Sequence, residues 1–288
     1  MANAGSLVAS PSSLAVEQAS PEPRSGGIFL PAASLCRREL VRFLRQRHRV
    51  TSAFFTPLLF WVFLGAGMGR SFHFEGMPAG TTFLQFFFPG TVLFILLSTA
   101  IFSTISIIED RKEGFLQSVL VAPVPRMAIV LGKVLGGTIL AMMPGIIFLA
   151  IAPLVGMPWK LAGFFAACGM MLIVSFSLTA LGFCIAWRMT STQGFHAIMM
   201  LLLLPLWFLS GAVFPPGGAW WPIRWLMRIN PLTYGWDGLW KSIYWNSPTA
   251  DLLGPSWGWV VGVSVAFAVV MVLFASKLAS VRSRADLQ

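Results

Sequence analysis

The sequence predicts an all-α integral membrane protein with six transmembrane helices, and three observations lead to this prediction. Of the 288 residues, 57% are hydrophobic and only 10% are charged, whereas a soluble domain has about 25% charged residues. Several charge-free stretches are each long enough for the ~20 residues of a helix that crosses a bilayer. The alternating segments of ~10 residues that mark a membrane barrel are not seen, so the spans are expected to be helices.

The spans are placed where the charge-free stretches are most apolar: near residues 51–69, 84–108, 134–155, 163–187, 195–214 and 257–276. Residues 1–32 are rich in Ala, Ser and Pro and are expected to form a disordered tail, without the pattern of a cleaved signal peptide. The transmembrane domain is then expected over residues 33–280, followed by a cytoplasmic tail over residues 281–288.

The orientation follows from the distribution of basic residues. Six spans place both termini on one side of the membrane, together with the segment 109–133, and this side holds 15 of the 20 Lys and Arg residues. The positive-inside rule therefore predicts that both termini are cytoplasmic. In a soluble protein the net charge of +10 would suggest nucleic acid. Here the bases flank apolar runs, which favours a topology signal and contact with anionic membrane lipids, and no nucleic-acid partner.

Residues 33–50 predict an amphipathic helix. One face carries Ala33, Cys36, Leu40, Phe43 and Leu44, and another carries the basic stripe Arg38, Arg42, Arg45 and Arg49. Such a helix is suited to lie on the inner leaflet. The alternative is that the arginines only set the topology. The three cysteines, Cys36, Cys168 and Cys184, have no metal-binding or disulfide spacing and are interpreted as small buried hydrophobes.

The segment 109–133 opens with five consecutive charged residues, Glu109 to Glu113. Apolar pairs at helical spacing follow, Phe115 with Val119 and Leu116 with Leu120, and they predict a short amphipathic helix that ends before the prolines of "APVP". The apolar face has no evident cover within the chain, which indicates a large partner on the cytoplasmic side. The alternative is a charged turn between two spans, and the pattern leaves open whether the helix restarts after Gly114.

At these residues the chain resembles the permease subunits of ABC transporters of the ABC-2 type. The first matching block consists of Glu109, Arg111, Glu113, Gly114, Leu116, Leu120, Pro123, Gly132 and Lys133. The second block is "LSGAVFP" at 209–215 followed by "NPLTYGWDGLW" at 230–240. Two positions depart from the family pattern: Gln117 stands where an acid is frequent, and Trp240 stands where Arg is frequent. The resemblance covers roughly residues 33–280.

The resemblance implies a permease that exports a lipophilic, amphipathic or lipid-linked cargo from the bacterial cytoplasmic (inner) membrane. It implies two permease copies and two separate ABC ATPase subunits that bind ATP and Mg. The implied coupling residues are Glu109, Arg111, Glu113, Gly114, Leu116, Leu120, Pro123, Lys133 and, in the second cytoplasmic loop, Arg188. The implied connecting helix along the membrane carries Arg38, Leu40, Arg42, Leu44 and Arg45.

The chain itself is not expected to be an enzyme or to bind a cofactor, and no catalytic or metal-binding residue is assigned. A phosphate-binding loop needs Gly, four residues, then Gly-Lys-Ser/Thr. Here Gly132-Lys133 is followed by Val134, and Met127 stands where the first Gly is required. The alternatives to a permease are an ion-coupled secondary transporter and an intramembrane enzyme. An ion-coupled secondary transporter usually carries a charged residue well inside a span, and an intramembrane enzyme needs clustered catalytic groups. Neither pattern is evident.

Residues 215–259 hold 8 of the 12 Trp residues and predict short outer helices, broken at Pro222 and Pro231, that re-enter the membrane or lie on the outer leaflet. The resemblance places this element beside the exit of the cargo path, through Phe214, Pro215, Asn230, Pro231, Tyr234 and Asp237. The alternative is an aromatic belt that only anchors the protein. Asp237 and Lys241 are spaced i, i+4 and are expected to pair.

Small and hydroxyl residues within the spans have two interpretations that the sequence leaves open. They are Thr99, Ser103 and Ser106 in the second span, Ser175 and Thr179 in the fourth, and Ser210 and Gly211 in the fifth. Such residues either pack helix against helix or line a path. Gly132 and Gly136 form a packing motif of the same kind, and Pro205 predicts a kink in the fifth span.

Overall fold

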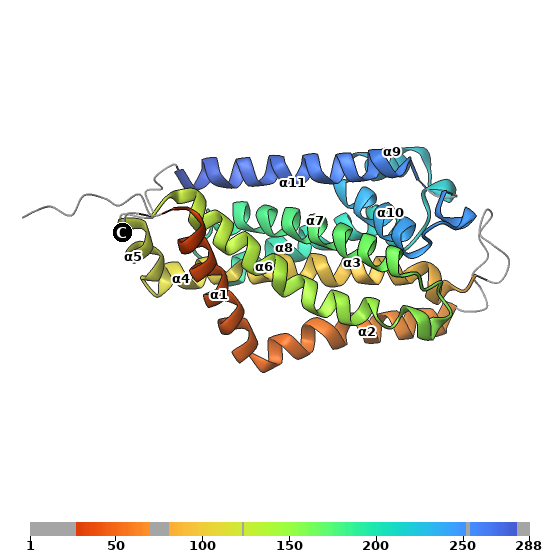
Figure 1. Cartoon of the computed structure of the whole chain (residues 1–288), viewed down its shortest axis with the longest axis horizontal. Helices are drawn as coiled ribbons and strands as arrows, with labels where there is room; N and C mark the ends of the chain where they lie inside the picture. Colours follow the sequence, from red (N-terminus) through yellow and green to blue (C-terminus); the bar gives the residue numbers. More distant parts are fainter. Residues whose placement is uncertain (1–26, 69–80, 123, 252–253, 281–288) are drawn as a thin grey trace, which may run out of the picture.

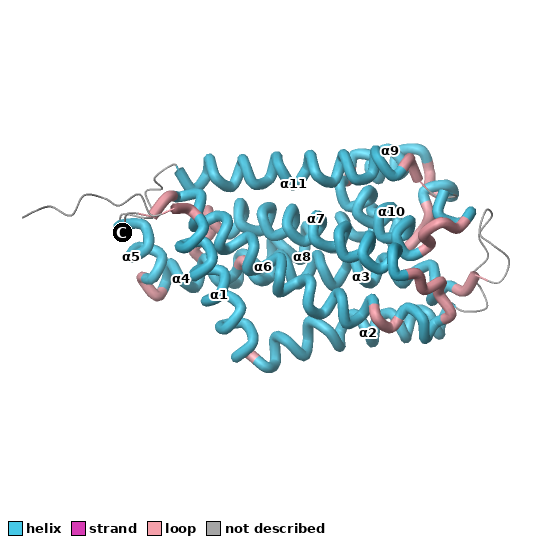
Figure 2. The backbone as a smooth tube through the Cα atoms, in the orientation of Figure 1, coloured by secondary structure: helices cyan, strands magenta, loops and turns pink. Residues whose placement is uncertain are grey.

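The computed structural model of the chain describes residues 27–68, 81–122, 124–251 and 254–280, without the side chains of residues 47–50 and 251. All regular elements within these ranges are helices (Figure 2). Several expectations lie outside the described residues: most of the predicted N-terminal tail, the tail at 281–288, and Pro123. The side chain of Arg49 is likewise not described.

Six helical segments are long and apolar enough to cross a membrane, so the predicted all-α membrane fold with six spans is confirmed. They are Thr51–Met68, Phe83–Lys112, Arg126–Val155, Leu161–Ala186, Thr192–Ala212 and Trp257–Ser280. The second span ends later than expected, and the third begins earlier. Both extensions carry charged residues, which ended the charge-free stretches in the sequence, and some of these, such as Asp110 and Lys133, are paired with each other in the folded chain.

The described residues form a succession of helices along the chain (Figure 1). Their bounds are α1 Phe29–Arg45, α2 Arg47–Met68, α3 Phe83–Ser103, α4 Ile105–Lys112, α5 Phe115–Val121, α6 Arg126–Leu149, η1 Ala152–Val155, α7 Leu161–Ala186, α8 Thr192–Trp207, η2 Phe208–Ala212, η3 Pro216–Gly218, α9 Trp221–Ile229, α10 Pro231–Ile243, η4 Pro248–Asp251 and α11 Trp257–Ser280. α8 contains Pro205 and continues into the π-helical turn η2, where Gly211 has a φ of 88°. The fifth span therefore departs from regular α-helix at Gly211, six residues after Pro205, where the kink was expected.

α3 is the central helix of the bundle. The most apolar window of its span is 78% buried, against 17% for α2 and 22% for α11. Consecutive side chains Phe86, Phe87 and Phe88 are all fully buried, so this helix is surrounded by protein. The outer helices expose large apolar side chains, for example Phe63 at 71%. In a bilayer these faces meet lipid or another apolar surface.

The two ends of the bundle differ. α5 lies at one end, together with the last turn of α11, whereas α9 and α10 lie at the other (Figure 1). α10 packs inside the bundle, with Trp236 and Trp240 fully buried. α9 exposes Trp221 and Trp225. The Trp-rich segment is thus divided between a helix that enters the bundle and a helix on its surface.

Candidate functional site

The charged segment continues the second span and then turns sharply. α4 follows α3 after the single residue Thr104, and it ends at Lys112. Gly114 then adopts a left-handed conformation with a φ of 75° and begins α5. Only glycine adopts this conformation without steric cost, so the question left open by the sequence is answered: α5 restarts after Gly114.

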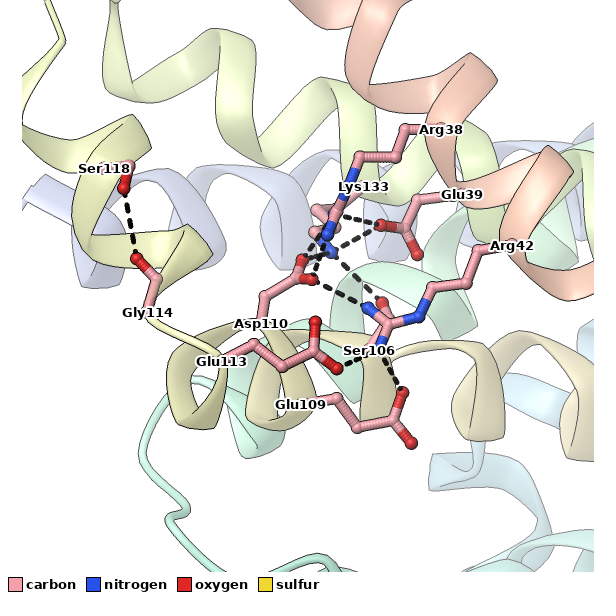
Figure 3. A network of polar contacts seen from close by, with 10 residues as sticks. All are labelled: Arg38, Glu39, Arg42, Ser106, Glu109, Asp110, Glu113, Gly114, Ser118 and Lys133. Carbon is pink, nitrogen blue, oxygen red and sulfur yellow. Dashed lines mark hydrogen bonds and ion pairs between the residues drawn. The ribbon is translucent and has the colours of Figure 1, made fainter.

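Asp110 lies at the centre of an ion network at this end of the bundle (Figure 3). Its side chain is fully buried and accepts hydrogen bonds from Arg38 Nη1 at 3.0 Å and Arg38 Nη2 at 2.7 Å. Arg42 Nη1 donates to the same carboxylate at 2.8 Å, and Lys133 donates to its Oδ2. A buried carboxylate needs such partners because desolvation of an unpaired charge is costly.

Lys133 connects this carboxylate to α1 and α4. Its ammonium group, 5% exposed, also donates to Glu39 Oε1 at 2.5 Å and to Ser106 Oγ at 3.2 Å. α1 approaches α6 closely at Gly132 and Gly136. A Cβ at Gly132 would lie 2.7 Å from Leu35 Cβ, and one at Gly136 would lie 3.0 Å from Glu39 Cβ. The two glycines therefore form the expected packing motif and allow Glu39 to reach Lys133.

The edge of the network is more exposed. Arg42 Nη2 pairs with Glu113 at 2.8 Å and with Glu109 at 3.2 Å. The Arg38 guanidinium stacks on the ring of Phe115, with Cζ 3.5 Å from its centroid. Hydrogen bonds to Asp110 raise the pKa of Arg38, so its charge is permanent. Together these contacts join α1, α4, α5 and α6 into one unit.

These contacts correct the expectation for the basic stripe. Arg38 and Arg42 face acids of the same chain and not the headgroups of the inner leaflet. Arg45 and Leu44 are exposed, and Leu40 is half-buried. The sequence pattern indicated a charged face but not its target, because its partners lie about 70 residues further along the chain.

The apolar face of α5 is also oriented differently from the expectation. Leu116, which was assigned to a partner, is only 3% exposed and belongs to the hydrophobic core, and Leu120 packs against that core. Val121, by contrast, is 88% exposed, and Gln117 and Ser118 are exposed as well. These three residues, Gln117, Ser118 and Val121, are called the α5 ridge below, and they form its outward surface.

Arg111 joins the two loops at this end. Its Nη1 donates to the carbonyl oxygen of Met189 at 2.7 Å, and its Nη2 to that of Trp187 at 2.6 Å. Both carbonyls follow the end of α7, where helix geometry leaves them without intrahelical partners. Arg188, between them, is exposed. Arg111 therefore joins α4 to the loop after α7.

Most of the hydroxyl and small residues in the spans lie in helix contacts. Ser103 and Thr179 both approach Gly137. Ser175 donates to Met171 O, and Ser106 accepts from Lys133. Ser210 is fully buried, and Gly211 lies against the ring of Trp236. The contacts of these residues are therefore with other residues of the same chain, and whether any of them also lines a path stays open.

Thr99 differs because it lines a cavity of about 350 Å³ between α2, α3 and α8, called the α3–α8 cavity below. Its Oγ1 has no hydrogen-bond partner among the described residues. His196 also lines the cavity, with its ring 5.2 Å from that of Phe102. The walls are otherwise mainly apolar, with Phe94 and Met200 among them.

The outer element is ordered by hydrogen bonds around the start of α10. Asn230 caps this helix by accepting from Leu232 N at 3.0 Å, and its Nδ2 donates to Leu206 O at 2.7 Å. Pro231 takes the first helical position, where a missing N–H has no cost. Tyr234 donates to Arg228 O at 2.9 Å. Phe214 is half-buried and Pro215 is buried, and both line a shallow pocket beside η3.

Asp237 and Lys241 do not form the expected ion pair. Lys241 Nζ donates to the carbonyl oxygen of Ala250 at 3.0 Å. The Asp237 side chain is 3% exposed and has no hydrogen bond or ion pair with any described residue. The i, i+4 spacing suggested a pair, but the loop after α10 draws the lysine away.

Two residues of the ion network were not singled out in the sequence, Asp110 and Glu39. Glu39 is the only acid between residues 28 and 50, and an isolated acid within a basic helix indicates a specific partner. Asp110 stands within the charged run, where the pattern does not distinguish it from its neighbours. Within the described residues no group of His, Cys, Asp or Glu could hold a metal ion.

Comparison with known proteins gives one family and several relatives. The family model described as "ABC-2 type transporter" matches residues 32–244. The chain is 25% identical over 263 residues to a Porphyra purpurea protein named "Putative transport permease ycf38", with 88% of this chain and 87% of that protein covered. It is 26% identical over 208 residues to the protein of the same name from Cyanophora paradoxa, with 69% of each covered.

Proposed function

The chain belongs to the ABC-2 type transporter family, and from this premise we propose that it is the permease subunit of an ATP-driven exporter whose ATP is hydrolysed by a separate subunit. Family membership and the transport permease relatives support a transport subunit that pairs with an ABC ATPase. ATP and Mg are bound by that partner. The permease spans the bacterial cytoplasmic membrane with both termini in the cytoplasm.

The observation that carries this proposal is the α5 ridge. Val121 exposes 88% of its surface at the end of a short helix. The same helix is fixed to the membrane bundle by buried Leu116 and by the contact of Phe115 with Arg38. An exposed apolar side chain on a firmly held helix is suited to dock into a groove of a partner. The ATPase subunit docks here, and the ion network transmits its movement to α1, α4 and α6.

The cargo path is proposed to include the α3–α8 cavity. Its mainly apolar walls, with His196 and a few hydroxyl side chains such as Thr99 as the polar groups, suit a lipophilic, amphipathic or lipid-linked cargo. A second copy of the permease completes the path. The exposed apolar faces support such pairing, since Leu201 on α8 is 78% exposed next to cavity residue Met200.

The proposal is tested by co-expressing the full-length chain with each ABC ATPase encoded in the same genome. One ATPase should co-purify with the tagged permease in detergent at a ratio of one to one. Its ATPase activity should rise when the complex is placed in lipid nanodiscs and change with amphipathic compounds. Transport of a compound by the permease without any ATPase would contradict the proposal.

A further inference from the structure

A second cavity, of about 450 Å³, lies at the end of the bundle opposite α5, between α9 and α10. It is called the α9–α10 cavity. Residues at helical spacing face it from both helices, and the first residues of α11 close one side. The residues that the argument uses are Arg224 and Arg228 of α9, Thr233, Tyr234 and Asp237 of α10, and Trp259 of α11.

Asp237 is the buried polar group of this cavity. Its side chain is 3% exposed and makes no hydrogen bond or ion pair with a described residue, although it lines the cavity wall. The loop covers it on another side, because a Cβ at Gly254 would lie 2.6 Å from the Asp237 carboxyl carbon. A buried carboxylate without a partner is unfavourable. A cationic group that enters the cavity would supply the missing partner.

The arginines place positive charge at the mouth of the same cavity. Arg224 and Arg228 are exposed and form no ion pair with described residues. Arg224 Nη2 is held by the carbonyl oxygens of Gly217 at 3.0 Å and Ala219 at 3.3 Å. These bonds use one nitrogen of the guanidinium and leave the others available. Two such groups one helical turn apart are suited to bind a phosphate.

The arrangement of the charges, with arginines at the mouth and a carboxylate inside, determines which kind of ligand fits the cavity. A simple anion attracted by the arginines would meet the Asp237 carboxylate inside, and a simple cation would be repelled at the mouth. A zwitterion with a terminal ammonium and an adjacent phosphate fits both. Trp259, which lines the cavity, is 60% exposed, and Trp prefers the headgroup region of a bilayer.

We propose that the α9–α10 cavity binds an ammonium–phosphate zwitterion, the headgroup of an aminophospholipid, with the ammonium on Asp237 and the phosphate on Arg224 and Arg228. The headgroup enters with its ammonium first, and the acyl chains stay in the adjacent leaflet. Binding requires neither ATP nor cargo, so this site stands or falls independently of the proposed transport function.

The test measures lipid retention by the full-length chain. The protein is reconstituted in nanodiscs with equal amounts of phosphatidylethanolamine and phosphatidylglycerol, re-extracted in detergent, and its bound lipids are quantified by mass spectrometry. The wild type should retain phosphatidylethanolamine over phosphatidylglycerol by about tenfold, the size expected for one charge-assisted contact. Asp237→Asn should abolish this preference. The double variant Arg224→Gln/Arg228→Gln should lose both lipids.

Controls separate the site from general effects of charge and folding. Lys160→Gln removes an exposed cation at the same end of the bundle but outside the cavity, and it should retain lipid like the wild type. Size-exclusion profiles show whether each variant is folded. If Asp237→Asn is not folded, the lipid retention of the double arginine variant decides the test. Equal phosphatidylethanolamine retention by the wild type and Asp237→Asn would overturn the proposal. Soluble phosphoethanolamine tests whether the ligand is a lipid. If it binds tightly but displaces no lipid, the proposal that the headgroup belongs to a lipid is overturned.

Discussion

Arg38 and Asp110, 72 residues apart in the sequence, form a two-bond ion pair in which Nη1 lies 3.0 Å from Oδ2 and Nη2 lies 2.7 Å from Oδ1. This pair fastens α1 to the end of the second span. Planar two-bond pairs between arginine and carboxylate fix orientation as well as distance. The α5 end of the bundle is therefore held to α1 by side-chain bonds as well as by the chain connection.

The first prediction concerns the centre of this network. Asp110→Ala leaves Lys133, Arg38 and Arg42 facing one another without their shared acid. Removing one partner of a buried ion pair costs ~3–5 kcal/mol, so thermal unfolding in detergent should begin at a clearly lower temperature. Glu113→Gln is the matched control, because its side chain is 56% exposed and an exposed pair contributes only ~0–1 kcal/mol. Equal shifts for both variants would contradict the central role of Asp110.

The second prediction concerns the turn before α5. Gly114 has a φ of 75°, and an added Cβ would meet no atom within 4 Å. Gly114→Ala should therefore cost only backbone strain, ~1–2 kcal/mol, and should weaken ATPase co-purification by tilting α5. Gly114→Asn is the control, since Asn tolerates the left-handed region better. If the Gly114→Ala and Gly114→Asn variants co-purify the same amount of ATPase, the proposed role of the left-handed turn is contradicted.

The six spans could be predicted from the sequence because each contains about twenty residues without charge, and lipid leaves few other structures open to them. The sequence left open whether α10 enters the bundle or lies on the outer leaflet, because Asp237 and Lys241 give it the pattern of a surface helix. Some of its polar groups are satisfied locally, for example Thr233, which donates to the carbonyl oxygen of Met227 at 2.6 Å.

The sequence predicted where the candidate site lies, but not which face of α5 points away from the bundle. The charged run and the short helix after it were recognised, yet Leu116 was assigned to a partner and proves to be buried. In a helix of seven residues, the direction of each face is decided by the Gly114 turn and not by periodicity. Likewise, the targets of Arg38 and Arg42 depend on how α1 crosses α6, which no local pattern encodes.

The third prediction concerns pH. Burial raises the pKa of Asp237 to about 7 from its ordinary value of 3.8, against the opposing effect of Lys241. The folded state thus holds this proton more tightly than the unfolded state. The resulting stability is fully present below about pH 4 and is lost as the pH rises through about 7. The other charged groups that line the cavity are Arg224 and Arg228.

The melting temperature of the wild type in phosphatidylglycerol nanodiscs should therefore fall between pH 5 and pH 8. Asp237→Asn removes the titrating group and should reduce this fall. The comparison uses the difference between the two proteins, so that titration elsewhere in the chain cancels. A fall of the same size in both would contradict the raised pKa.

The fourth prediction concerns topology. With the native cysteines replaced, a cysteine at Ser118 should react with membrane-impermeant thiol reagents only from the cytoplasmic side, and one at Gly218 only from outside. Ser118 is exposed on α5 and Gly218 ends η3 at the opposite end of the bundle. Labelling of both positions from the same side would contradict the orientation.

The central claim is that the α5 ridge, and not the buried face of α5, binds the ATPase. Burying an exposed Val is worth ~1.5–3 kcal/mol, so Val121→Asp should weaken association by at least about tenfold. Leu154→Asp is the matched control, because Leu154 is 85% exposed in η1 at the opposite end. Leu116→Ser should instead destabilise the permease itself, since this side chain is 3% exposed.

The most direct measurement is the amount of ATPase that co-purifies with each variant, normalised to folded permease by size-exclusion chromatography. The account predicts that Val121→Asp loses the ATPase and yields normal amounts of folded permease, while Leu154→Asp keeps both. It is contradicted if Val121→Asp retains the ATPase at the wild-type ratio.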